Sequence, residues 1–345
     1  ELGSHRIGMN STKHNKRINN TLVCKAFPHL TSYLSRNKFI REPHLLISVL
    51  VFEETWYLKE FFDNIMAFTS NTTLVLAHLS SISNYTESDI IDIANHHPRL
   101  VVNCYRYFTK AYHGSLAHAH LRNIQWAMGL GINISHVLLW ASNSWFIRRG
   151  IENYVNKHGS SLTNLEGTVR KNAFVQRLDV GRILPDPRPG WAPKEVFSRV
   201  WSWKPFREVI APKAPAGSPV NTVTLSKHEG AFFPGPLMQK IVKAFDEDMF
   251  ESLAEQHVYM EEFLFQTWAD HHRCEAGNGT GHTTVFVKTQ SHSKKNPELK
   301  YVRVSDVKNT LRNYADVFGI KSIGREKKDF HGTRAYLKQI APDEL

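Results

Sequence analysis

The first half of the chain alternates between apolar runs typical of buried strands and spacings typical of amphipathic helices. Residues 45–52 form an apolar, β-branched run, which is typical of a strand buried on both faces. The same kind of pattern predicts four strands, at residues 45–52, 73–79, 99–104 and 136–140. Helical spacing predicts four helices, at residues 55–68, 87–97, 114–128 and 146–158, with Thr55 as a cap of the first. Four strand–helix units in succession predict an α/β fold with one open, mostly parallel sheet flanked by helices.

Sheets of this kind bind ligands at the carboxyl ends of their strands. The residues that follow the predicted strands are Glu53, Glu54, 78–80, 106–115 and 141–143. No GxGxxG or Walker pattern follows the first strand, which argues against a dinucleotide enzyme and against a P-loop NTPase.

The middle of the chain differs in composition from both flanks. Residues 185–219 hold eight of the fifteen prolines, together with Trp191, Trp201 and Trp203. Proline disfavours helix and central strand, so we expect an irregular excursion or a linker. Tryptophan beside basic residues suits stacking on a sugar ring, and it equally suits pinning an irregular loop to the core.

Glycine and proline around Phe232 and Phe233 predict a shaped loop that opens the last part of the chain. The patterns beyond it predict helices at residues 236–245 and 250–268, a strand at 283–288 and a further element at 304–314. A basic segment follows from Lys321.

Two adjacent acids, Glu261 and Glu262, lie within the apolar and aromatic stretch of residues 259–268. Neighbours on a helix point about 100° apart, so we expect one acid to face solvent and the other to be pushed toward Phe263, Phe265 and Trp268. A carboxylate in such surroundings loses water and its pKa rises, which suits a general base near neutral pH. The alternative is an ordinary amphipathic helix with both acids at its polar edge.

Composition and charge limit the function classes. The 345 residues can bury a full core, and the formal net charge of +11 suits a nucleic acid or a nucleotide diphosphate. No zinc-finger, RNA-recognition or basic-zipper pattern is present, so we expect no nucleic-acid partner. We expect a basic tail over residues 1–42, of which 1–8 read as a remnant of cloning, so that Met9 would be the natural start. One catalytic domain would occupy residues 43–345.

Metal and disulfide patterns are weak. The nineteen histidines include no HExxH spacing, and the one Asp-x-Asp, Asp246-Glu247-Asp248, falls between two predicted helices and reads as a solvated helix end. The three cysteines argue against a disulfide framework and favour a reducing compartment, so we expect a cytoplasmic protein. The longest apolar run is strand-sized, and we expect no stable membrane insertion.

Taken in order over residues 45–340, these pieces resemble a known family. It is that of the core-2/I-branching β-1,6-N-acetylglucosaminyltransferases and peptide O-xylosyltransferases, family 14 of the glycosyltransferases, and above all its soluble microbial members. The family's His-x-Asp is matched by His78-Leu79-Ser80, and its Trp-Gly-x-Ser-like turn by His113-Gly114-Ser115. Residues 140–145 match its Ser-Gly-x-Asp-x-Pro segment.

Further along, the loop before Phe232 resembles the family's Gly-x-x-Phe segment, and the run from Glu261-Glu262 to Thr267 resembles its Asp-Glu-x-x-x-x-Thr motif. The basic C-terminal segment resembles the part that holds the donor diphosphate. Two departures matter: Ser80 and Asn143 stand where the family has acids, so donor base recognition and substrate orientation would differ.

The resemblance implies a GT-A-like fold with a single Rossmann-like sheet, and an inverting, metal-independent transfer without any cofactor. Xylose or N-acetylglucosamine would move from a UDP-sugar to a glycan or glycoprotein acceptor. Glu262 would be the base and Glu261 its neighbour, although the order could be reversed. Lys321, Arg325 and Lys327 would stabilise the diphosphate; the first two lie four apart and share one face if helical.

The remaining site residues follow from the same reading. The nucleotide-binding half, residues 43–160, would contribute Glu53, His78, Arg106, His113, Gly114 and Ser115. Residues 161–345 would form the acceptor-binding and catalytic half. The residues expected to bind the acceptor are Ser142, Asn143, His228, Glu229, Phe232 and Trp203. Two rivals stay open: a metal-dependent transferase on the same fold, and a basic polyanion-binding module without catalysis. The animal members of the family are Golgi proteins, so the Golgi lumen is the alternative compartment if an anchor was removed.

Overall fold

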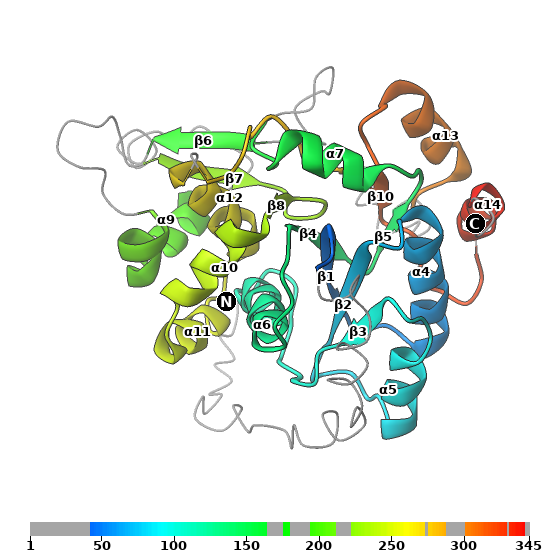
Figure 1. The fold of residues 1–345 in the computed structure, drawn as a ribbon, viewed down its shortest axis with the longest axis horizontal. Helices are drawn as coiled ribbons and strands as arrows, with labels where there is room; N and C mark the ends of the chain where they lie inside the picture. Colours follow the sequence, from blue (N-terminus) through cyan, green and yellow to red (C-terminus); the bar gives the residue numbers. More distant parts are fainter. Residues whose placement is uncertain are drawn as a thin grey trace, which may run out of the picture.

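A five-stranded sheet forms the centre of the molecule (Figure 1), and its strands run in the order β3–β2–β1–β4–β8. The computed structural model describes residues 42–163, 175–179, 194–211, 222–272, 275–287, 301–329 and 331–341. The strands of this sheet are β1 (Leu45–Val51), β2 (Thr73–Leu79), β3 (Leu100–Val102), β4 (His136–Ala141) and β8 (Phe232–Pro234). The first four are parallel, and β8 is antiparallel to β4. The predicted α/β fold with a mostly parallel sheet is therefore confirmed.

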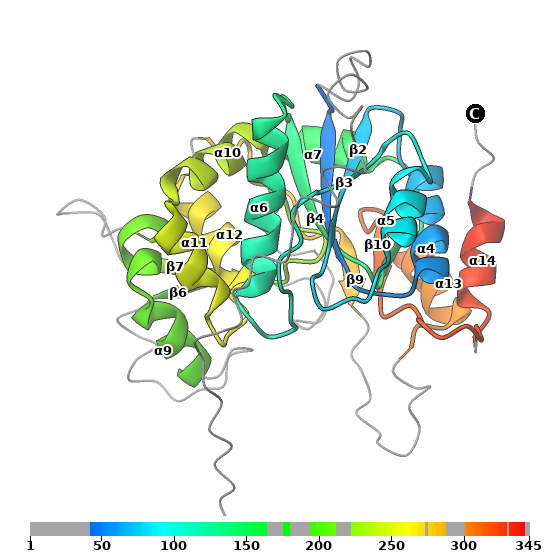
Figure 2. The same ribbon diagram turned by 90° about the horizontal axis from the view of Figure 1, so that it is seen from below.

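Helices cover both faces of this sheet, as Figure 2 shows. The helices that connect its parallel strands are α4 (Thr55–Phe68), α5 (Glu87–Ala94) and α6 (Ser115–Gly129). Alternate side chains of β1 point to opposite faces, so Leu45 and Ile47 pack with the core beneath α4 while Leu46 packs with α6. All seven residues of β1 are buried, as expected for a strand covered on both sides.

A polar interruption of β1 has a partner on α6. Ser48 is buried, and its Oγ lies 2.9 Å from Nδ1 of His120. The side-chain amide of Asn123 donates to the same Oγ over 3.0 Å. Because these groups satisfy one another, a serine is tolerated inside an otherwise apolar strand.

The second half of the chain adds helices beside α6 and two small sheets. The helices near α6 are α10 (Gly235–Ala244), α11 (Glu247–Ala254) and α12 (Glu261–His271). One small sheet consists of β5 (Ser144–Phe146), β10 (Gly319–Lys321) and β9 (Val285–Val287). The other pairs β6 (Val175–Asp179) with β7 (Thr222–Ser226). Further helices are α7 (Ile151–His158), α13 (Val304–Asn313) and α14 (Thr333–Ile340).

The structure corrects several details of the predicted elements. The helix predicted at 146–158 begins only at Ile151, because Phe146 belongs to β5, where its ring stacks 4.1 Å from that of Trp140. The single helix predicted at 250–268 is broken into α11 and α12. At the break, the carbonyl of Gln256 accepts a hydrogen bond from Gly114 N over 2.7 Å. Thr55 is the first residue of α4 and not its cap.

The proline-rich middle contains helix, contrary to the prediction. A helix, α9 (Lys194–Ser202), and a π-helical turn, η1 (Phe206–Ile210), lie within residues 185–219. The stretch between Pro193 and Pro205 holds no proline, so the backbone there can form a regular helix. Trp191 and the tail expected over residues 1–42, apart from Glu42, lie outside the described residues.

Among the described helices, none combines the length and the apolar composition needed to cross a membrane.

Candidate active site

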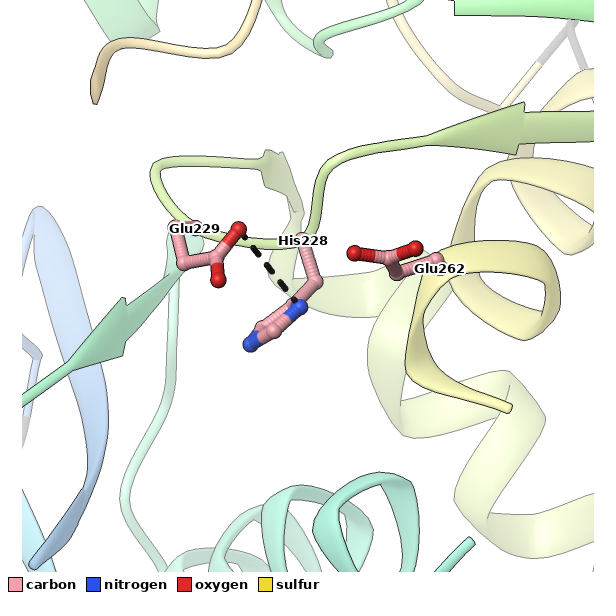
Figure 3. Close-up of side chains that lie close together, drawn as sticks. All are labelled: His228, Glu229 and Glu262. Atoms are coloured by element: carbon pink, nitrogen blue, oxygen red, sulfur yellow. Dashed lines mark ion pairs between the residues drawn. The ribbon is translucent and has the colours of Figure 1, made fainter. Parts of the chain in front are cut away.

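Three distant segments of the chain bring charged side chains together near the carboxyl end of β4. They are the loop between β7 and β8, the first turn of α12 and the end of β10. We call this group the acid–lysine cluster; it consists of Lys227, His228, Glu229, Glu261, Glu262 and Lys321. Figure 3 shows three of its side chains facing one another: His228, Glu229 and Glu262.

A glycine turn positions the loop that carries His228 and Glu229. Gly230 has a φ of +76°, and a Cβ there would lie 2.6 Å from the backbone nitrogen of Val285. Its own N–H donates to the carbonyl of Leu139 in β4 over 2.8 Å, and its carbonyl accepts from Thr284 N over 2.9 Å. The turn is therefore tied to the sheet, and glycine is required there.

Both acids of the Glu261-Glu262 pair are buried, so the expectation that one would face solvent is wrong. Glu261 is 2% exposed and Glu262 is 7% exposed. Helix α12 is buried on every side from Glu261 to Ala269, because it contacts β7, η1 and α6. The two side chains point about 100° apart and therefore have different partners, although both are buried.

Burial dominates the protonation of this pair. It raises the pKa of Glu262 to about 8, and Lys227, whose Nζ lies 3.7 Å from Glu262 Oε1, acts in the opposite direction. Burial and the neighbouring Glu262 raise the pKa of Glu261 well above its ordinary value. The predicted shift of a buried carboxyl toward neutral pH is thus present in both acids.

The pKa of Glu229 shifts in the opposite direction. Burial acts to raise its pKa, but His228, Lys321 and Lys227 outweigh burial and hold the pKa below its ordinary value. Burial lowers the pKa of His228 to about 4, so at neutral pH the imidazole is uncharged and the lysines supply the compensating charge. The ammonium of Lys321 donates to Glu229 Oε1. Burial works against the charge of Lys321, yet Glu229 raises the pKa of that lysine.

Several polar atoms of the cluster are open to a ligand. His228 Nδ1, Glu229 Oε2 and Glu261 Oε2 are buried and have no hydrogen-bond partner within the described part of the chain. His228 Nδ1 lies 3.7 Å from Glu229 Oε2, which is too long for a hydrogen bond. A buried polar atom without a hydrogen-bond partner commonly binds a substrate group, a water or an ion.

Three of these residues offer donor atoms to a metal ion. One atom each from His228, Glu229 and Glu262 lie within 4.8 Å of one another. Ligands about 2.0–2.6 Å from an ion are at most about 5 Å apart, so three donor atoms this close together can share one ion. Lys227 and Lys321 lie against two of the same carboxyls. A divalent cation bound to this donor set would therefore compete with two ammonium groups for Glu229 and Glu262.

A second charged group lies where β1 and β4 end. Glu53 Oε1 accepts from the Ser142 hydroxyl over 2.5 Å and lies 3.0 Å from Arg325 Nε. The Arg325 guanidinium also covers the ring of Phe52, 4.8 Å from its centroid. Three predicted site residues, Glu53, Ser142 and Arg325, are thus brought together, but Arg325 does not share a helix face with Lys321. Lys321 ends β10, and residues 322–325 are irregular.

Most of the other residues predicted for the nucleotide shape the segment from 103 to 114. His78 is fully buried and its Nε2 lies 3.2 Å from Tyr107 N. Arg106 donates to the carbonyls of Ser80 and Ser83. His113 Nδ1 accepts from Ser115 N over 3.3 Å, and Gly114 N donates to Gln256 O.

Two residues predicted for the acceptor lie in the core. Phe232 is fully buried in β8, and Trp203 packs against Phe245 while its Nε1 donates to Ser252 Oγ over 3.1 Å. For Trp203 this placement favours the reading in which a tryptophan pins the chain to the core. Asn143 uses its carbonyl to accept from Ser322 N over 3.0 Å, and Lys327 is exposed.

Sequence reasoning missed Lys227 and Tyr259. Lys227 is a single lysine beside His228 and Glu229, and no spacing rule marks it. Tyr259 precedes the acid pair, and burial, followed by the charges of Glu262 and Glu261, raises the pKa of its phenol. The Asp246-Glu247-Asp248 run, in contrast, is an exposed helix start as predicted, with Asp246 Oδ1 accepting from Met249 N over 2.8 Å.

Cys104, at the end of β3, is disulfide-bonded. The cysteines therefore give no support to the expected reducing compartment, because disulfides persist mainly in oxidising ones.

Comparisons with known proteins give distant likenesses. No protein-family model matches the chain, and no curated protein matches it. A mannosyltransferase, PcManGT from Pyrobaculum calidifontis in complex with GDP-Man and Mn2+, is similar with 15% identity and a TM-score of 0.26, over 42% of this chain and 47% of that one. The apo structure of the WbbM bifunctional glycosyltransferase is similar with 10% identity and a TM-score of 0.34, over 89% of this chain and 51% of that one.

The chain spans about half the length of each of these two solved structures. At such scores neither likeness carries an argument about activity, so the function is argued from the site.

Proposed function

We propose that this protein is an inverting, metal-independent glycosyltransferase that moves a sugar from a UDP-sugar to a hydroxyl group of a carbohydrate acceptor. The observation that carries the proposal is Glu262. Its buried carboxyl has a pKa raised to about 8 and belongs to a cluster beside the carboxyl end of β4. A carboxylate of that basicity takes a proton from an alcohol far more readily than an exposed one does.

The proposed reaction needs a base for the acceptor hydroxyl and positive charge for the leaving diphosphate. Glu262 accepts the proton of the acceptor hydroxyl while the acceptor oxygen bonds to the anomeric carbon. The bond from that carbon to the diphosphate oxygen breaks on the opposite face. The electron pair leaves with the diphosphate, whose growing negative charge must be stabilised. Burial, followed by the charge of Glu262, raises the pKa of Glu261 well above its ordinary value.

Lys321 and Arg325 are the proposed partners of the diphosphate. Lys321 belongs to the acid–lysine cluster, and Arg325 reaches the group of Glu53 and Ser142 at the ends of β1 and β4. Both cations therefore contact residues near the carboxyl ends of central strands, where such sheets bind ligands. In this proposal the diphosphate replaces Glu229 and Glu53 as their partner, and the exposed Lys327 adds long-range attraction.

Membership in family 14 is also part of the proposal. The order of the motifs from His78 to Thr267 supports it, and with it xylose or N-acetylglucosamine as the sugar and a glycan or glycoprotein as the acceptor. The division into a nucleotide-binding half, 43–160, and an acceptor-binding half, 161–345, belongs to the same proposal. The disulfide at Cys104 favours the Golgi lumen over the cytoplasm as the compartment.

A metal-dependent transferase is the second candidate. The placement of His228, Glu229 and Glu262 favours it, since all three offer a donor atom to one point. Lys227 and Lys321 favour the first candidate, because they already place positive charge beside Glu262 and Glu229.

Thermal shift and transfer assays separate the candidates. We expect UDP-xylose or UDP-N-acetylglucosamine to raise the melting temperature in excess chelator, and transfer to persist there. Glu262→Gln should keep the shift with UDP and lose transfer by about 10²- to 10⁴-fold, the usual contribution of a general base. Glu275→Gln, at an exposed position, is the matched control and should keep both.

Two results would decide against the proposal. Transfer that requires added Mn²⁺ would favour the metal-dependent enzyme. Absence of any shift with a panel of nucleotide sugars, combined with salt-sensitive binding of polyanions, would favour a binding module instead.

A further inference from the structure

Exposed aromatic rings gather at one edge of the central sheet. Within the part of the chain that the structure describes, the large hydrophobic side chains that are exposed are Phe52, Ile82, Tyr105, Phe108 and Tyr112. All five follow β1, β2 or β3, whose carboxyl ends share one edge because the strands are parallel. Clusters of exposed apolar side chains mark sites of interaction.

The backbone that carries three of these rings is firmly held. Within residues 103–114, Tyr107 turns inward, stacks on His78 with centroids 5.7 Å apart, and accepts a hydrogen bond at its carbonyl from Ser81 N over 3.0 Å. The end of the segment is fixed at Gly114, where a Cβ would lie 2.2 Å from the carbonyl oxygen of Leu253. The outward rings are therefore presented by a fixed backbone, and their exposure does not come from a loose loop.

Tyr112 is the most exposed of these rings, and its backbone is unusual. It is 77% exposed, and its φ of +58° lies in the left-handed region, which tyrosine rarely adopts. Such conformations persist where the surrounding structure imposes them, and they concentrate at functional sites. The fold thus accepts an unfavourable backbone and an exposed ring at the same position.

The ring of Tyr112 contacts Tyr259, which lies near the candidate base. It meets the ring of Tyr259 at 71°, with centroids 6.2 Å apart. Tyr259 lies close enough to the acid pair for the charges of Glu262 and Glu261 to raise the pKa of its phenol, after burial. Two aromatic side chains in contact therefore connect the acids with the surface.

We propose that Tyr112 stacks against a non-reacting sugar ring of an oligosaccharide acceptor, so that the acceptor has at least two sugar units. This inference rests on the proposed transferase function, which places the reacting hydroxyl at Glu262. One face of a pyranose ring presents C–H bonds that pack on an aromatic face, while the phenol hydroxyl bonds to the sugar's own hydroxyl groups. Tyr105 and Phe108, on the same segment, extend the surface for longer acceptors.

A lipid surface is the competing occupant, because exposed rings beside a basic residue such as Lys110 also suit a membrane interface. The contact between Tyr112 and Tyr259 favours the glycan. It connects the surface with buried acids, and attachment to a bilayer requires no such connection.

Two variants at position 112 test the proposal in the full chain. Tyr112→Gly removes the ring and suits the positive φ, so the variant should fold with an equal or higher melting temperature. Tyr112→Phe keeps the ring and is the matched control. The probe is an array of neutral oligosaccharides of one to six units, read without any donor. We expect the protein to prefer units of two or more, Tyr112→Gly to lose affinity about fivefold or more, and Tyr112→Phe to keep most of it.

The outcomes are distinct. Equal array binding by Tyr112→Gly, a preference for single sugars, or no array binding at all would overturn the proposal. A further contradicting result would be binding to phosphatidylcholine vesicles that needs the Tyr112 ring, together with array binding that does not need it. That result would assign the surface to lipid. Glu275→Gln, at an exposed position outside the acid–lysine cluster, should bind the array as the unaltered protein does. Ring-dependent binding in a protein that transfers no sugar would refute the proposed function and leave the glycan surface standing.

Discussion

Replacing Glu262 with glutamine should stabilise the protein, and increasingly so as the pH rises. The carboxyl has an ordinary pKa of 4.5 in the unfolded chain and a pKa of about 8 in the folded protein, where burial disfavours its charge. Between these values the folded state holds a proton that the unfolded state has released. Stability is therefore fully present below about pH 4.5 and falls as the pH rises toward 8.

The magnitude follows from the two pKa values. With about 1.36 kcal/mol for each pKa unit, the loss between pH 5 and pH 7 is about 2.5 kcal/mol, and a further loss of about 1.4 kcal/mol follows by pH 9. Glutamine does not titrate, so the stability of Glu262→Gln relative to the unaltered protein should rise by these amounts. Over most of this range Glu262 is protonated, so the loss of its ion pair with Lys227 costs little below pH 8.

Urea unfolding at pH 5, 7 and 9, followed by tryptophan fluorescence, measures this difference. Glu275→Gln is the control, because that carboxylate is exposed and its hydrogen bond with Lys240 lowers its pKa, so no gain with pH is expected. A stability difference between Glu262→Gln and the unaltered protein that stays constant from pH 5 to pH 9 would refute the reasoning that Glu262 is a desolvated acid.

Three further predictions concern activity and packing. The kcat/KM for transfer should rise with pH and level off above about pH 8, where Glu262 is ionised, and a profile that is flat from pH 6 to 9 would exclude it as the base. Lys321→Met leaves Glu229 buried without its main cation and should cost about 3–5 kcal/mol of unfolding free energy. Adding Glu229→Gln should recover most of that loss, and an equally unstable double variant would contradict the pairing. Gly114→Ala should destabilise the protein by about 1–3 kcal/mol, because the new Cβ would lie 2.2 Å from a carbonyl oxygen of α11. Gly129→Ala has open space around it and should be neutral or stabilising. Equal effects of the two variants in unfolding experiments would contradict the close contact at Gly114.

Local patterns predicted the sheet and its helices closely. The bounds predicted for α4 and β2 coincide with those in the structure, and β1 differs by one residue. These elements are long, and their apolar positions repeat with the period of a strand or a helix, so neighbouring residues alone specify them. The short strand β5 was not predicted, and its last residue, Phe146, was assigned to the following helix, since three residues are too few to show a period.

The sequence by itself determined that an α/β sheet would gather polar residues at its carboxyl edge, and that an acid pair in an apolar helix would be chemically unusual. Only the tertiary structure decided that both acids are buried, and that Lys321 pairs with Glu229 across 92 positions of the chain. The same holds for the contact between Tyr112 and Tyr259, which spans two separate elements. Periodicity reports which side of an element faces the core, whereas the partner across the gap depends on how whole elements pack, and that information lies in no local stretch of sequence.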